Sequence, residues 1–195
     1  MRKFLFAALI ATAATTAAFA GPFENGAAAY KRGDWQGAMN AWHDLAATDP
    51  MVQNNIGIMY KDGKGVRRDN AMAVQWLSRS ASGGNSFGQN NLGGMYRDGL
   101  GVKQDYARAI TFFRAAAQQG NGGAQVNLGL MLAKGEGTKV DMVSAYMWFD
   151  LAAQSVPQAV SYRSQAAARM SRGDVTLASV ASQRCRQANY KNCAV

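Results

Sequence analysis

Hydrophobic and polar positions recur every 36 residues through the middle of the chain. Three segments begin with Asn, an aliphatic residue and Gly, at Asn55, Asn91 and Asn127, and each has a Met four residues after the Asn. A second apolar stretch follows each segment. Within each half the apolar residues lie three or four apart, which is typical of amphipathic helices. A repeat of this length predicts stacked helical hairpins. We expect three of them, at residues 51–86, 87–122 and 123–156.

Glycine and aspartate mark where each predicted helix ends and the next begins. A glycine pair ends the first helix of every hairpin, since Gly adopts the left-handed backbone of a helix terminus without steric cost. These pairs are Gly63 and Gly65, Gly99 and Gly101, and Gly135 and Gly137. An Asp then opens the second helix, as an N-cap or as a first-turn charge. These residues are Asp69, Asp105 and Asp141.

The flanking segments predict further helices around the three repeats. Residues 21–50 resemble a tetratricopeptide hairpin with a tight turn at Gly33-Asp34. Residues 157–195 form two more polar helices, as expected of an end cap. The chain is therefore predicted to be all-α, a right-handed solenoid of about ten helices with a C-terminal capping pair.

One copy carries a family resemblance in full. From Asn91 to Ala109 the sequence reads Asn-Leu-Gly-x-Met-Tyr-x-Asp-Gly-x-Gly-Val-x-x-Asp-Tyr-x-x-Ala. This pattern resembles the Sel1-like repeat, a branch of the tetratricopeptide-type solenoids, and residues 52–154 carry it. The resemblance implies a superhelix whose first helices line a concave groove. It also implies a role as an adaptor or periplasmic regulator, such as an inhibitor of sensor kinases or a scaffold for polysaccharide export, without naming one partner.

The first twenty residues have the features of a secretory signal peptide. Arg2 and Lys3 precede an apolar run, and Ala18-Phe19-Ala20 forms an A-x-A cleavage site. The alternative is a buried N-terminal helix. We expect residues 1–20 to be a signal peptide cleaved after Ala20. The mature protein would then be periplasmic or secreted and would not span a membrane.

Basic charge is concentrated at the C-terminal end. The formal net charge is +9, and after residue 154 six Lys and Arg residues face Asp174 alone. Basic patches often bind nucleic acid, but an exported protein seldom meets it. Acidic protein, an anionic wall polymer or lipid headgroups are the partners this charge favours. The other interpretation is a solvated surface that binds nothing.

The two cysteines, Cys185 and Cys193, lie near the C-terminus. An even number in an exported chain favours a disulfide. On one straight helix they would be about 12 Å apart, which is too far for a disulfide. The chain must therefore turn back after Ala188 or Asn189.

Catalytic and metal-binding signals are weak. The one histidine, His43, lies beside Trp42, and Glu136 occupies a glycine turn that recurs without it. A general acid–base mechanism needs several such groups together. We therefore expect no enzyme, no catalytic, cofactor-binding or metal-binding residues, and no cofactor. A cell-wall hydrolase is kept as a minor alternative.

The predicted function is protein binding through the concave face. Asn55, Asn91 and Asn127 form a polar row on successive first helices, with a Met four residues beyond each that could adapt to varied side chains. The alternative is that these residues only tie the hairpins together. Positions that vary between repeats are the candidates for partner contact: Asn54, Ile58, Lys61, Asn90, Arg97, Val126 and Leu130. An anionic cell-wall or surface polymer held by the basic C-terminal end is the alternative function.

Overall fold

The computed structural model describes residues 21–191 and 193, which form ten helices and no strand. The predicted signal peptide lies outside the described residues. The helices are α1 (Pro22–Lys31), α2 (Trp35–Trp42), α3 (Pro50–Asp62), α4 (Asn70–Ser82), α5 (Ser86–Asp98), α6 (Tyr106–Ala117), α7 (Gly122–Lys134), α8 (Met142–Ala152), α9 (Ala159–Ala167) and α10 (Arg172–Gln187). The predicted all-α solenoid of about ten helices is confirmed.

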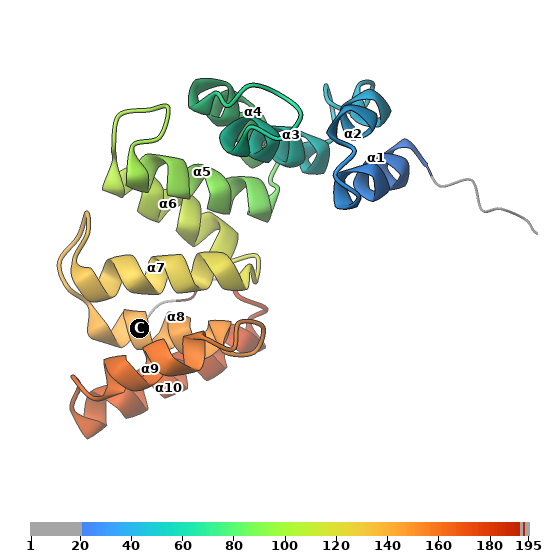
Figure 1. Cartoon of the computed structure of the whole chain (residues 1–195). Helices are drawn as coiled ribbons and strands as arrows, with labels where there is room; N and C mark the ends of the chain where they lie inside the picture. Colours follow the sequence, from blue (N-terminus) through green and yellow to red (C-terminus); the bar gives the residue numbers. More distant parts are fainter. Residues whose placement is uncertain (1–20, 192, 194–195) are drawn as a thin grey trace, which may run out of the picture.

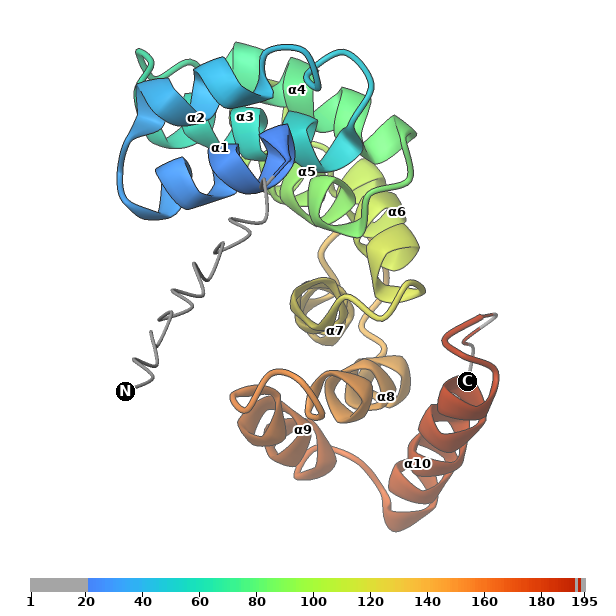
Figure 2. The ribbon, with the colours of Figure 1, turned by 90° about the vertical axis from the view of Figure 1, so that its right-hand side faces the viewer.

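The helices stack into a curved arc (Figure 1). The first eight pair in order as hairpins, and α4 packs on α5 and α6 on α7 to join successive hairpins. In Figure 2, where α7 is seen nearly end-on, α5, α7 and α9 line the inner side of the arc, while α6, α8 and α10 lie on its outer side. The first helix of each repeat therefore faces the concavity.

Local capping explains the helix boundaries. Asp69 accepts a hydrogen bond from the backbone N–H of Met72, and Asp105 and Asp141 do the same for the residues three positions on. These contacts satisfy a donor that the helix itself cannot. Gly63 ends α3 in the left-handed region with φ 70°, and the later repeats end their first helices in the same way. The predicted N-caps and glycine termini are confirmed.

A second set of glycines lets the two helices of each hairpin approach closely. A Cβ added at Gly93 would lie 2.8 Å from two ring atoms of Phe113, whose side chain is fully buried. Gly57 meets Leu77 and Gly129 meets Phe149 in the same manner. The large side chain of each second helix thus covers the bare backbone of the first.

Glutamines at the same position of each repeat join neighbouring hairpins. The side-chain amide of Gln125 donates to the backbone carbonyl of Ala117 at the end of α6, at 3.2 Å. Gln53 donates to Ala46 and Gln89 to Ala81 in the preceding hairpin. Because the last carbonyls of a helix lack partners within it, these amides stabilise the junction as well as fixing its register.

The C-terminal helices differ from the repeats in how they pack. Both α9 and α10 pack along α8, and Figure 2 shows them diverging from each other. The α9 helix begins at Ala159, after a turn that contains Pro157. The Ser171 hydroxyl caps α10 by accepting a hydrogen bond from the backbone N–H of Asp174. Among the described residues, no helix is both long and apolar enough to cross a bilayer.

Two neighbouring glycines on α5 test the close-approach argument. Gly93→Ala should lower the free energy of unfolding by roughly 1–3 kcal/mol, because the buried Phe113 ring cannot yield without strain. Gly94→Ala should raise it by about 0.5–1 kcal/mol through better helix propensity, since no atom lies within 4 Å of its added Cβ. Urea unfolding of both variants measures the difference, and equal effects would contradict the packing argument.

Candidate binding groove

The inner face of the central repeats is hollowed into a groove of about 640 Å³. Its lining comes from α3, α5 and α7 and from the turns that follow the first two. The lining residues are Lys61, Asp62, Lys64, Arg68, Asn90, Asn91, Gly94, Met95, Arg97, Asp98, Leu100 and Asn127. Most are polar or charged, so the groove suits a polar ligand better than the apolar molecules that typical ligand pockets enclose.

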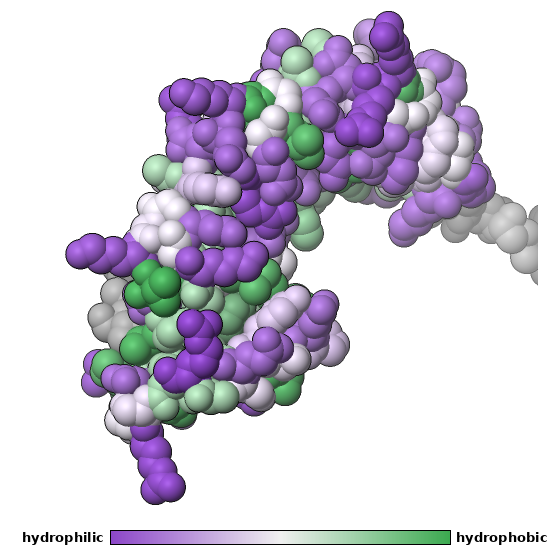
Figure 3. All heavy atoms as spheres, turned by 60° about the vertical axis from the view of Figure 1, so that its left-hand side comes forward, coloured by the Kyte–Doolittle hydropathy of each residue, from purple (hydrophilic) through white to green (hydrophobic). Residues whose placement is uncertain are grey.

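A smaller hollow of about 250 Å³ continues the groove toward the third repeat. The two share Arg97, Asp98 and Asn127, and the smaller one adds Leu130 and Glu136. Together they run across the first helices of three successive repeats. Figure 3 shows hydrophilic side chains over the upper part of the molecule, which the N-terminal and central hairpins form. The shape favours an elongated ligand.

The asparagine row forms hydrogen bonds between repeats. The amide of Asn91 donates to Asn54 at 2.8 Å, and the amide of Asn127 donates to Asn90 at 2.9 Å. Arg97 also donates to Asn127, at 3.2 Å. The alternative in which asparagines tie the hairpins together is therefore confirmed for Asn91 and Asn127, whereas Asn55 accepts a hydrogen bond from its neighbour Asn54. Asn90, Asn91 and Asn127 still line the groove.

Two expectations about side-chain exposure are wrong. Asn54 is only 4% exposed, because its side chain faces α5 and bonds Asn91. It therefore offers no accessible contact. Met59, Met95 and Met131 are at most 1% exposed and belong to the hydrophobic core. Met95, for example, lies in a cluster with Ala73 and Leu77 of the preceding hairpin. These methionines therefore cannot adapt to a partner at the surface.

The other predicted residues lie on or near the inner face. Lys61, Asn90 and Arg97 line the main groove, and Leu130 lines the smaller hollow. Ile58 and Val126 are half-buried and line neither.

Sequence reasoning missed two cationic residues that line the groove, namely Lys64 and Arg68. A signal existed, because the repeats differ at these positions. Lys64 corresponds to Leu100 and Glu136, and Arg68 to Gln104 and Val140.

Salt bridges fix some of the charged groups around the groove. Arg97 forms a two-point ion pair with Asp98, at 2.7 and 3.0 Å. Hydrogen bonding to Asp98 raises the pKa of Arg97, and the same contact lowers the pKa of Asp98. Asp62 is shared by Lys61 at 3.6 Å and Lys64 at 3.3 Å. Hydrogen bonds of the Lys64 ammonium group to Asp62 and Tyr30 raise the pKa of Lys64. Lys64, Arg97 and Asp98 are therefore charged at neutral pH.

The residues considered for catalysis are not brought together with one another. The His43 ring contacts Asp44 at 2.9 Å, and both side chains are almost fully exposed at the end of α2. Glu136 pairs with Lys134 at 3.5 Å in the third glycine turn. The structure therefore places these titratable groups on separate elements.

The basic C-terminal region is partly neutralised from within. Arg163 of α9 and Arg186 of α10 both bond the carboxylate of Asp150 on α8, and the Ser182 hydroxyl donates to it at 2.6 Å. Burial raises the pKa of Asp150, but Ser182 and the two guanidinium groups lower it by more. Arg163 therefore anchors α9 to α8 and is not available to an anionic polymer.

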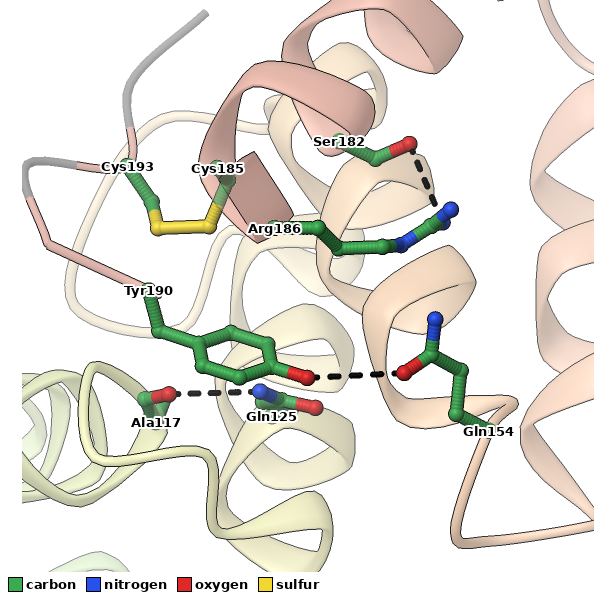
Figure 4. Close-up of a disulfide and its surroundings, with 8 residues drawn as sticks. All are labelled: Ala117, Gln125, Gln154, Ser182, Cys185, Arg186, Tyr190 and Cys193. Atoms are coloured by element: carbon green, nitrogen blue, oxygen red, sulfur yellow. Dashed lines mark hydrogen bonds between the residues drawn. A yellow bond between two sulfur atoms is a disulfide. The ribbon is translucent and has the colours of Figure 1, made fainter. Parts of the chain in front are cut away.

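The predicted disulfide between Cys185 and Cys193 is present, with a Cα–Cα distance of 4.9 Å (Figure 4). The chain turns back at Asn189 and Tyr190, which adopt φ values of 52° and 63°, as the spacing required. Tyr190 then lies against Gly120 and its hydroxyl bonds Gln154 at 3.4 Å. The disulfide therefore holds the end of the chain against the third repeat.

A family model for the Sel1 repeat matches residues 50–85, 86–121 and 123–155. These matches cover more than half of the chain. The chain belongs to the Sel1 repeat family. Among curated proteins, none matches it.

Solved structures of Sel1 repeat proteins are similar to this chain. A Sel1 repeat protein from Oxalobacter formigenes has 31% identity and a TM-score of 0.66, over 69% of this chain and 54% of the other. A protective antigen of uropathogenic Escherichia coli with an SLR fold has 27% identity and a TM-score of 0.62, over 78% of this chain and 39% of the other. This chain therefore spans about half or less of each relative.

The Asp150 cluster predicts a pH-dependent stability of the C-terminal helices. Asp150→Asn should cost roughly 1.5–3 kcal/mol near neutral pH, the range for hydrogen bonds to a charged group. Because the pKa of Asp150 is lowered in the folded protein, its contribution is present above the unfolded value of about 3.9. It is lost as pH falls through the folded value. The difference between variant and wild type in thermal unfolding should therefore shrink below about pH 4.

Asp44→Asn is the control, since that side chain is 97% exposed. It should leave the unfolding curve unchanged at every pH. A constant difference between Asp150→Asn and wild type down to low pH would contradict the assignment.

Proposed function

We propose that this Sel1 repeat protein is an exported scaffold or regulator that binds a protein partner along the inner face of its solenoid. The observation that carries the proposal is the groove of about 640 Å³ that crosses three first helices. Sel1 repeats commonly mediate protein–protein interaction, and the two solved relatives are bacterial. The Cys185–Cys193 disulfide is compatible with export.

The basic C-terminal region offers the alternative of binding an anionic polymer. Arg169, Arg172 and Arg184 are exposed and form no ion pair with the described residues. Arg163 and Arg186 are held by Asp150, so the available charge is smaller than the sequence suggests. We therefore favour the groove as the main binding surface.

Export is tested by the mass of the protein that accumulates in the cell envelope. Cleavage after Ala20 should leave a chain that begins at Gly21, as the basic start and Ala-Phe-Ala site indicate. Intact-mass spectrometry of a periplasmic or culture fraction measures this directly. Full-length protein that retains Met1 in the cytoplasm would refute export.

The groove is tested by filling it without changing its charge. Gly94→Leu places a side chain into open space on the groove floor, so the protein should fold and lose its partner. Gly173→Leu is the matched control on α10, where the nearest atom is 3.7 Å away. Photo-crosslinking in the envelope fraction should recover one prominent partner with wild type and the control, but not with Gly94→Leu.

A variant of the exposed cap completes that experiment. Replacing Arg169, Arg172 and Arg184 with Ser should leave the crosslinked partner in place, with at most a slower, salt-sensitive association. If this variant loses the partner and Gly94→Leu retains it, the function belongs to the C-terminal cap and the polymer alternative gains support.

A further inference from the structure

The groove lining lacks a side chain at one position. Gly94 lies at the position that Ile58 occupies in the first repeat and Leu130 in the third. A Cβ built at Gly94 meets no atom within 4 Å, so neither strain nor crowding requires glycine there. Glycine inside a helix costs roughly 0.5–1 kcal/mol relative to Ala. The open floor at Gly94 is thus a feature that fold stability does not explain.

The walls around this floor carry more positive than negative charge. Lys61, Lys64, Arg68 and Arg97 face two carboxylates, so the lining has a net charge of +2. Asp62 serves two lysines, and Arg68 forms no ion pair among the described residues. The carboxylate of a ligand could therefore form ion pairs with cations of the groove that lack a carboxylate of their own.

Two of these cations are held in position before any ligand arrives. The Lys64 ammonium lies 5.5 Å from the ring centres of both Tyr30 and Trp35 in the first hairpin. Arg97 is fixed by Asp98 and Asn127. Side chains that are already ordered lose little rotamer entropy on binding. The first hairpin thus contributes to the groove by orienting Lys64.

The charge changes along the groove, which distinguishes a protein segment from a uniform polyanion. At equivalent positions the first repeat carries Lys64 and the third carries Glu136. At the far end, Arg97 and Lys134 oppose Asp98 and Glu136, so the smaller hollow has no net positive charge to hold a polymer that carries a negative charge on every unit. An extended peptide can place acidic residues at one end only, and its backbone can bond the asparagine amides that line the groove.

We infer that the groove docks an extended acidic segment of a partner protein, with one Asp or Glu side chain entering the hollow above Gly94 and its carboxylate facing Arg97, Lys61, Lys64 and Arg68. This inference rests on the proposed function and adds the chemistry of the partner. Electrostatic complementarity of this kind supplies specificity and speeds association.

Labelled dodecapeptides of defined sequence test the inference with the purified mature protein. The probe is a Gly-Ser peptide with a central run of Glu, and its counterparts carry Gln or Lys in place of Glu. Fluorescence anisotropy should show binding of the Glu peptide at least about tenfold tighter than of the Gln peptide, weakening as salt rises. Equal binding of the Glu and Gln peptides would overturn the inference.

Adjacent arginines give a matched pair of charge variants. Arg68→Gln removes a cation from the groove lining, whereas Arg67→Gln removes one that lies outside it. The first should weaken the Glu peptide several-fold, because it removes a cation that the carboxylate meets directly. The second should have little effect, because salt screens a charge that lies outside the groove. Equal losses would show general attraction of an anion and refute a built site.

Gly94→Leu separates failure of this inference from failure of the proposed function. It should abolish binding of the Glu peptide while Gly173→Leu binds normally. If Gly94→Leu loses the crosslinked partner but wild type ignores the Glu peptide, the groove binds protein and the acidic specificity is wrong. If the Glu peptide binds Gly94→Leu as tightly as wild type, the hollow above Gly94 is not the site.

Discussion

The close approach of the two helices in each hairpin sets the geometry on which the solenoid depends. It occurs where a glycine of the first helix meets the large side chain of the second, as with Gly93 and Phe113. With the same contact in three hairpins, successive layers have one shape and stack in one register. The residue after each glycine then lies toward the inner side of the arc, where Gly94 and Leu130 line the hollows. Packing thus requires glycine at the core position of each first helix, whereas the residue that follows this glycine can vary between repeats.

Much of the fold could be predicted because its signals are local. Asp69 caps α4 through a contact three residues away, and Gly63 ends α3 through its own backbone angle. The turn that allows the Cys185–Cys193 disulfide follows from helix geometry alone. Such features need no knowledge of what the rest of the chain contacts, so periodicity and turn chemistry were sufficient to place them.

The candidate site was predicted less well because its residues depend on distant neighbours. Asn54 and Asn91 are 37 positions apart, yet their hydrogen bond buries Asn54. Helical periodicity shows that two residues share a face, but it cannot show which faces of two repeats meet. Gln53, Gln89 and Gln125 recur with the same 36-residue spacing as the asparagines. Only their contacts with the preceding helix reveal that they join repeats.

The charge that is available for binding could not be predicted from the sequence either. Counting residues places the excess of positive charge at the C-terminal end, but Asp150 engages two of those arginines in holding α9 and α10 to α8. Near Gly94 four cations face two carboxylates. One of these carboxylates, Asp62, serves two lysines, and Arg68 has no acidic partner among the described residues. Binding free energy comes from groups whose pairing a partner can complete. Charges that are already paired in the fold contribute mainly to stability. The binding surface is therefore distinguished by which charged groups lack an ion-pair partner, and not by the number of charged residues.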